Sequence, residues 1–67
     1  MEIKEKELLD FCRWYKEHHG EKSERNVFDT ALCGYFHVSP KEAKQMVRIC
    51  KHSMIVREWK GFIRIVR

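Results

Sequence analysis

The sequence predicts a small α+β domain, mainly α, in which three helices precede a two-stranded β-hairpin. Apolar residues recur with the helical period of 3.6 in three stretches before position 53. Turn-prone residues separate these stretches, and from Met54 onward β-branched and aromatic residues flank a Lys60-Gly61 pair. With 67 residues, the chain is expected to form one domain over residues 1–67, near the lower size limit for a self-sufficient core.

The first helix is expected over residues 2–19, and Gly20 ends it because glycine readily adopts the left-handed conformation of a helix C-terminus. One broad arc of this helix carries Leu8, Phe11, Cys12, Trp14, Tyr15 and His18. Leu9 falls outside the arc. We therefore expect Leu9 and Trp14 to contact a second copy in a homodimer, although scattered apolar residues are equally common on monomer surfaces.

The second helix is expected over residues 27–36, after a polar connector at residues 21–26 in which Ser23 or Asn26 caps the helix. Its predicted apolar arc consists of Val27, Phe28, Ala31, Leu32 and Tyr35. Roughly three residues then lead to the next helix, and so short a connection requires a sharp turn between the two helices.

The third helix, residues 40–52, has the most complete start signal in the chain. Ser39 caps it, Pro40 suits its first position, and Glu42 completes a capping box. The predicted inner arc is Ala43, Met46, Val47 and Cys50, and the outer arc is Lys41, Lys44, Gln45, Arg48 and His52. Solvated helix faces usually mix charge signs, whereas the one acid here lies in the first turn. The outer arc is therefore predicted to meet an anionic partner.

Residues 54–66 are expected to form the hairpin, because Gly61 can supply the positive φ of a tight turn. If Trp59 faces Phe62, the hairpin has two distinct faces. One carries Val56, Glu58, Ile63 and Ile65, and the other carries Ile55, Arg57, Trp59, Phe62, Arg64 and Val66. The two arginines would then oppose each other, which is unfavourable unless an anion lies over them; a bulge at Gly61 would shift the register and separate them.

Charge is distributed unevenly along the chain, whose net charge is +4. Residues 1–21 contain four basic and six acidic side chains, whereas residues 22–67 contain ten basic and four acidic ones. This asymmetry indicates a polyanionic partner. Charge alone does not distinguish nucleic acid from an acidic protein or an anionic membrane surface. No apolar run approaches the ~20 residues of a membrane span, and the charged N-terminus does not resemble a signal peptide, so a cytoplasmic location is expected.

The cysteines and histidines do not form a recognisable chemical motif. They are Cys12, Cys33 and Cys50, and His18, His19, His37 and His52. No C-x-x-C pair is present, and the only close histidines are adjacent residues, whose side chains diverge by ~100° on a helix. We expect no metal, no cofactor and no enzymatic activity. Cys12 and Cys50 lie on apolar arcs as small hydrophobes, whereas Cys33 is expected to be exposed.

In the order of its elements, the whole chain resembles the winged helix-turn-helix DNA-binding domains. The resemblance rests on Ala31 in the second helix, Val38-Ser39-Pro40 entering the third, Ala43 and Val47 on its inner face, and Lys60-Gly61 at the hairpin tip. One position departs from the family pattern. Helix-turn-helix proteins often have glycine four residues after the small residue at the Ala31 position, and here that position is Tyr35, with Gly34 one place earlier.

The resemblance implies that helix 40–52 enters the major groove of DNA as a recognition helix and that hairpin 54–66 is the wing. The resemblance also implies that four side chains of this helix face the groove: Lys41, Lys44, Gln45 and Arg48. Gln45 and Arg48 would read base edges, since Gln pairs with adenine and Arg with guanine. Implied phosphate contacts are Lys22, Arg25, Lys51, Arg57, Lys60 and Arg64, together with the helix N-terminus at Ser39.

These considerations predict a sequence-specific double-stranded DNA-binding protein, a small dimeric transcriptional regulator. Winged-helix folds also bind proteins, and an exposed apolar patch involving Leu9, Trp14, Trp59 or Phe62 would favour that alternative. A third alternative is RNA, since Trp59 and Phe62 near Lys60 could stack on unpaired bases, although such residues more often pack a small core.

Overall fold

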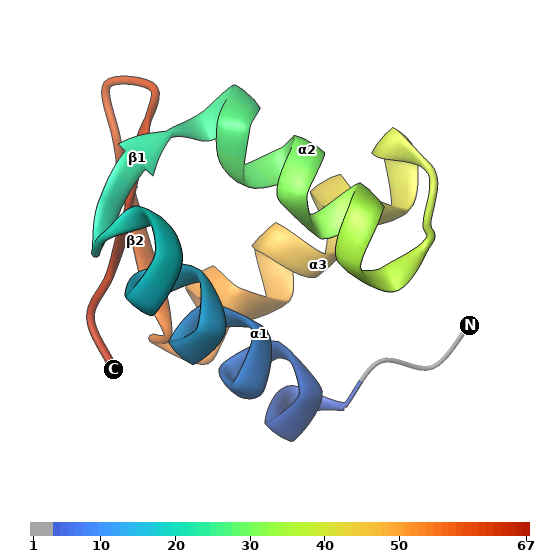
Figure 1. Ribbon diagram of the computed structural model, residues 1–67, viewed down its shortest axis with the longest axis horizontal. Helices are drawn as coiled ribbons and strands as arrows, with labels where there is room; N and C mark the ends of the chain where they lie inside the picture. The colour runs from blue at the N-terminus through green and yellow to red at the C-terminus, as the bar shows by residue number, and fades with distance from the viewer. Residues whose placement is uncertain (1–3) are drawn as a thin grey trace.

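The predicted fold class is confirmed by the structure, a computed structural model that describes residues 4–67 (Figure 1). The chain is α+β and mainly α, with a winged-helix-like layout. Its elements are α1 (Glu5–His19), β1 (Lys22–Glu24), α2 (Arg25–Phe36), α3 (Pro40–His52), β2 (Val56–Trp59) and β3 (Phe62–Ile65). Lys4 is the N-cap of α1, so the helix begins at Glu5, and the predicted helical residues 2 and 3 lie outside the described part.

A third strand, β1, forms where the sequence predicted a polar connector. It pairs antiparallel with β3, which gives a sheet of order β1-β3-β2. The hydroxyl of Tyr15 in α1 donates a hydrogen bond to Ser23 Oγ at 2.8 Å. Neither predicted cap of α2 was correct, because the helix already begins at Arg25 and its N-cap, Glu24, makes no side-chain capping bond.

The predicted start of α3 and the predicted end of α1 at His19 are confirmed. The capping box of α3 is complete, with the Glu42 N–H donating to Ser39 Oγ and the Ser39 N–H donating to Glu42 Oε1. Gly20 ends α1 with φ 88° but ψ 174°, an extended value rather than the predicted left-handed helical one. His37 (φ 56°, ψ 49°) adopts the left-handed conformation in the short turn between α2 and α3, so this turn forms without the glycine that helix-turn-helix proteins often have.

One hydrophobic core joins all three helices to the inner face of the sheet. The buried residues are Leu8, Phe11, Cys12, Tyr15, Phe28, Leu32, Ala43, Met46, Val47, Cys50, Ile55, Val56, Ile63 and Ile65. Ile55 was predicted on the outer face of the hairpin, but it precedes β2 and is fully buried, with its N–H bonded to the Cys50 carbonyl. Ile55 lies in the connection between α3 and β2 and not in the strand itself. Its side chain therefore need not follow the inward and outward alternation of β2.

The orientation of α2 also differs from the prediction. Phe28 and Leu32 are buried, but Val27 and Tyr35 are 46% and 45% exposed. Phe36 packs partly against the core instead, as does Cys33, which was expected to be exposed. The tertiary contacts of α2 with α1 and α3 thus select a buried arc rotated away from the one that apolar periodicity alone suggested.

Cys12 and Cys50 are buried, as predicted. Contact with Cys50 and burial raise the pKa of the Cys12 thiol well above its usual range. Both cysteines therefore act as apolar packing residues in the contact between α1 and α3.

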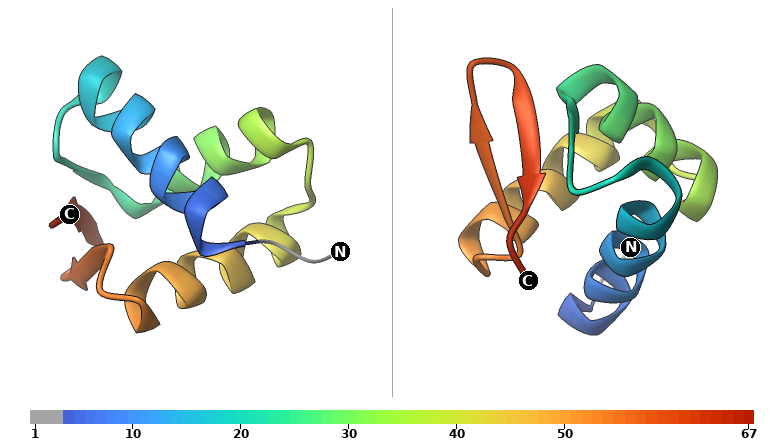
Figure 2. Two further views of the ribbon diagram at one scale, coloured as in Figure 1. Left: turned by 90° about the horizontal axis from the view of Figure 1, so that it is seen from below. Right: turned by 60° about the vertical axis from the view of Figure 1, so that its left-hand side comes forward.

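The helices cover only one face of the sheet. In Figures 1 and 2 the hairpin stands at one end of the helical layer, and the α2–α3 turn lies at the opposite end. The burial pattern agrees, because inner residues of β2 and β3 are buried while alternate residues are exposed. In residues 4–67, none of the helices has the length and apolar character needed to cross a membrane.

Candidate nucleic-acid interface

The outer face of α3 carries a stripe of polar side chains, which we call the α3 stripe: Lys41, Lys44, Gln45 and Arg48. All four are exposed, whereas the opposite face of the helix is buried in the core. Positions separated by three, four and seven residues lie on one side of an α-helix, here spread over about 10 Å of its axis. Within residues 4–67, no ion pair involves the three cations of the stripe. The stripe is therefore a positively charged ridge on a rigid element.

The N-terminus of α3 is less open to a phosphate than the resemblance implied. The Ser39 hydroxyl both accepts from the Glu42 N–H and donates to Glu42 Oε1 at 3.1 Å. This places a carboxylate where a phosphate would have to bind, and that carboxylate already interacts favourably with the positive end of the helix dipole. Ser39 accordingly has a structural role in starting the helix.

Glu58 connects the wing to both neighbouring helices. Its carboxylate accepts from Arg25 Nη1 of α2 at 2.6 Å and from Lys51 Nζ of α3 at 2.9 Å. Arg25 also pairs with Asp29 at 3.0 Å. The hydrogen bond from Lys51, together with the charge of Arg25, lowers the pKa of the Glu58 carboxyl despite partial burial. The arrangement holds the hairpin in a fixed position beside α3.

Two predicted phosphate contacts thus belong to this ion-pair network. The Arg25 side chain is 23% exposed; partial burial disfavours its charge, but hydrogen bonds to Asp29 and Glu58 prevail and raise its pKa. Lys51 keeps a more open side chain, 46% exposed. Arg25 therefore has a structural partner on each side, whereas Lys51 remains accessible to a ligand next to the α3 stripe.

The outer face of the sheet gathers cations from all three strands. Arg57 of β2 pairs directly opposite Arg64 of β3, which confirms the predicted register without a bulge. Lys22 of β1 lies opposite Arg64 on its other side, and this neighbour was not predicted. Glu21 partly balances Arg64, at 3.5 Å and with both side chains at least half exposed. We call Lys22, Arg64 and Arg57 the cation row.

The hairpin tip has an unusual backbone. Lys60 (φ 50°) and Gly61 (φ 80°) have consecutive positive φ values, as in a type I′ turn, and the role of Gly61 is as predicted. A lysine in this conformation costs about 1 kcal/mol relative to a glycine. The Lys60 ammonium lies 4.6 Å from the centre of the Trp59 ring, and Trp59 is 71% exposed. The tip presents a cation and an indole ring to solvent.

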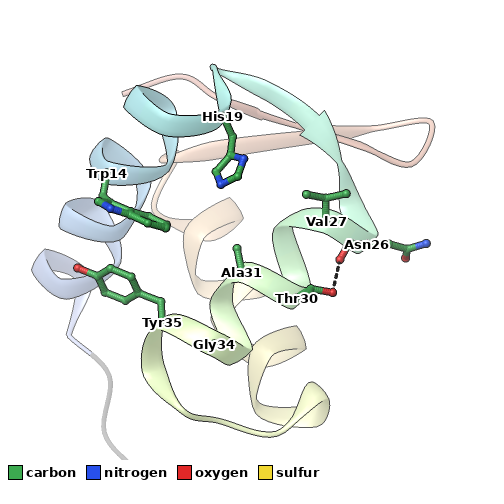
Figure 3. Close-up of a pocket in the computed structure, with 8 residues that line it drawn as sticks. All are labelled: Trp14, His19, Asn26, Val27, Thr30, Ala31, Gly34 and Tyr35. Atoms are coloured by element: carbon green, nitrogen blue, oxygen red, sulfur yellow. Dashed lines mark hydrogen bonds between the residues drawn. The ribbon is translucent and has the colours of Figure 1, made fainter.

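An apolar pocket of about 670 Å³ lies between α1 and α2 (Figure 3). Its lining residues are Trp14, His19, Asn26, Val27, Thr30, Ala31, Gly34 and Tyr35. Trp14 and Tyr35 contact each other at 5.3 Å between ring centroids, and Trp14 is 37% exposed. Sequence reasoning missed this pocket because Val27 and Tyr35 were assigned to the core. Leu9, the other residue proposed for a dimer, packs partly against the core.

In the part of the chain that the structure describes, no group of three or more His, Cys, Asp or Glu residues could hold a metal ion. Comparisons with protein-family models, curated proteins and solved structures find no match for this chain. The α3 stripe, the outer face of the sheet and the apolar pocket are the surface features that bear on function.

Proposed function

We propose that this chain is a sequence-specific double-stranded DNA-binding protein of the winged helix-turn-helix type, with α3 as recognition helix and the β2–β3 hairpin as wing. The observation that carries the proposal is the α3 stripe, whose three cations and one amide point to solvent without an acidic partner in residues 4–67. A ridge of this kind suits the major groove, which admits an α-helix and displays base edges between two rows of phosphates. A small cytoplasmic transcriptional regulator is the role we infer.

The side chains of the α3 stripe would have two different roles in binding DNA. Lys41 and Lys44 would neutralise phosphates, releasing counterions and supplying affinity for any sequence. Gln45 and Arg48 have the bidentate geometry that distinguishes adenine and guanine in the major groove. Because the Glu58 network fixes the wing against α3, Lys60 at the hairpin tip could contact the same duplex.

Fluorescence anisotropy with a labelled mixed-sequence duplex tests the electrostatic part of the proposal. Binding should weaken as salt rises. The logarithm of the association constant should fall linearly with the logarithm of the salt concentration, with a slope of about −0.9 for each phosphate neutralised. Reversing charge in the variant Lys44→Glu or Arg48→Glu should weaken binding much more than Arg13→Glu, an equal charge change at an exposed position of α1. Undetectable binding at low ionic strength, or equal losses in all three variants, would contradict the proposal.

A second measurement addresses sequence readout. After a preferred site has been selected from random duplexes, Arg48→Ala should reduce affinity for that site by about 1–3 kcal/mol and relax specificity. Lys60→Ala should instead weaken binding to specific and random duplexes equally. If both variants lose the same amount on both kinds of DNA, Arg48 does not read bases.

The apolar pocket favours a second candidate function, binding of a partner protein. Val27 and Tyr35 are half exposed beside Trp14, an arrangement typical of protein contact sites. A partner that is retained by the Lys44→Glu/Arg48→Glu double variant but lost by Val27→Glu would favour this candidate.

The proposed homodimer through α1 is tested by sedimentation equilibrium, in which Trp14→Ala should shift the wild-type dimer toward monomer.

A further inference from the structure

The outer face of the sheet has side chains that the core does not explain. Along β2 and β3 the inner residues Val56, Ile63 and Ile65 are buried, so the core is complete on that side. The outer face nevertheless exposes two aromatic residues, Trp59 and Phe62, which pair across the strands. Aromatic residues that contribute nothing to a core in so small a domain indicate a binding surface.

The cation row lies directly beside these rings. Arg57 is two residues before Trp59 on β2, and Arg64 is two residues after Phe62 on β3, so all four point to the same side of the sheet. Lys22 extends the row on β1, and its ammonium lies 5.1 Å from the Phe62 ring centre. Together Lys22, Arg57, Trp59, Phe62 and Arg64 line a pocket of about 280 Å³.

The row is electrostatically unfavourable in the absence of an anion. Three like charges opposite one another across adjacent strands repel, because cross-strand neighbours lie only about 5 Å apart at Cβ. Two acids are near: Glu21 pairs with Arg64 at 3.5 Å, and the exposed Glu24 lies opposite Phe62. Neither pairs with Arg57 or Lys22 in residues 4–67. A bound phosphate would relieve the repulsion within the row.

Flat rings next to cations match the chemistry of an unpaired nucleotide. A base stacks on an aromatic ring while its phosphate binds a neighbouring Arg or Lys, and the surfaces that bind single strands combine these two features. A duplex cannot use the rings in this way because its bases already stack on each other. An acidic peptide would satisfy the cations but would leave the exposed face of the Trp59 indole uncovered.

We propose that the outer face of the sheet binds single-stranded nucleic acid, with a base stacked on Trp59 and its phosphates held by Arg57, Arg64 and Lys22. This site shares no residue with the α3 stripe, so it goes beyond the duplex readout proposed for α3, and variants of the two surfaces can test them separately. A protein with both sites could hold a duplex next to an unpaired segment.

The test is anisotropy of a fluorescein-labelled dT20 oligonucleotide, with rU20 as a parallel probe for the sugar. Wild-type protein should bind dT20 with a salt slope of about −0.7 per phosphate contacted. Trp59→Ala should lower the affinity for dT20 about 5- to 150-fold, the effect of losing one base–aromatic stack. Tyr35→Ala, which removes an exposed aromatic ring from α2, is the matched control and should have no effect on dT20 binding.

Crossed variants separate the two sites. Trp59→Ala should weaken dT20 binding and leave duplex binding within about twofold, whereas Lys44→Glu should do the reverse. Arg57→Gln should also weaken dT20 binding. Circular dichroism and a melting curve of each variant check that the fold is intact. Failure of dT20 to bind, equal affinity of wild type and Trp59→Ala for dT20, or loss of dT20 binding only with Lys44→Glu would overturn the proposal. So would binding to phosphatidylserine vesicles that is lost with Trp59→Ala while dT20 binding is unchanged.

Discussion

The Glu58 carboxylate connects the wing to both neighbouring helices, and replacing Glu58 by glutamine tests how much that contact contributes. Glu58 receives hydrogen bonds from Arg25 and Lys51 at 2.6 and 2.9 Å, and its side chain is 23% exposed. Hydrogen bonds to charged groups contribute about 1.5–3 kcal/mol and exposed ion pairs about 0.2–1 kcal/mol. For two contacts at intermediate exposure we expect Glu58→Gln to lower the free energy of unfolding by about 1–2 kcal/mol, or the melting temperature by about 4–16 °C.

The effect should depend on pH in a defined direction. Hydrogen bonding to Lys51, with a further contribution from Arg25, lowers the pKa of Glu58 in the folded protein. Because the folded pKa is below the unfolded value of about 4.3, the stabilisation is complete above that value and is lost as pH falls through the folded pKa. The difference between wild type and Glu58→Gln should therefore be full at neutral pH and shrink in strong acid.

Urea unfolding followed by circular dichroism at neutral and acidic pH measures both quantities. Glu21→Gln is the matched control, because Glu21 pairs with Arg64 at 3.5 Å on the same sheet but with both side chains at least half exposed. That substitution should change stability by less than about 0.5 kcal/mol. The reasoning is refuted if the two variants are equally stable, or if the loss in Glu58→Gln is the same at both pH values.

Three further predictions concern the core and its borders. Tyr15→Phe should destabilise the fold by about 1 kcal/mol in chemical denaturation, because it removes the hydrogen bond that ties α1 to Ser23 of β1. Ser39→Ala should cost about 0.5–2 kcal/mol by the same measurement through loss of the α3 cap, and a neutral result would mean that the capping box contributes nothing. Ellman's reagent should react with at most one thiol of the native protein, that of Cys33, and with all three after unfolding; rapid reaction of a second native thiol would contradict the burial of the other two.

Local features of the chain were predictable because they depend on residues close together in sequence. The start of α3 follows from the Ser39-to-Glu42 capping box, and its two faces follow from the helical period. The hairpin register follows from Gly61 and from strand alternation, which place Arg57 opposite Arg64. The α3 stripe, on which the proposed function depends, could therefore be identified before any tertiary contact was known.

Features that depend on distant partners were missed. The strand β1 consists of Lys22, Ser23 and Glu24, which have no apolar alternation, and it forms because β3 offers unpaired backbone groups at its edge. The ion pair between Arg25 and Glu58 joins residues 33 positions apart, so no local pattern indicates it. The rotation of α2, which exposes Val27 and Tyr35, likewise depends on how three helices fit together.

The amino-acid sequence by itself determined the three helices, the hairpin, the start of α3 and its charged outer face, because hydrogen bonds and side-chain periods within a few residues decide these. Only the tertiary structure decided which cations remain free. It pairs Arg25 with acids, and it places Lys22 beside Arg64, which has Arg57 on its other side, on the outer face of the sheet. The reason is physical: a side chain's charge is set by its own residue type, but its partners are set by which surfaces the packed core leaves in contact.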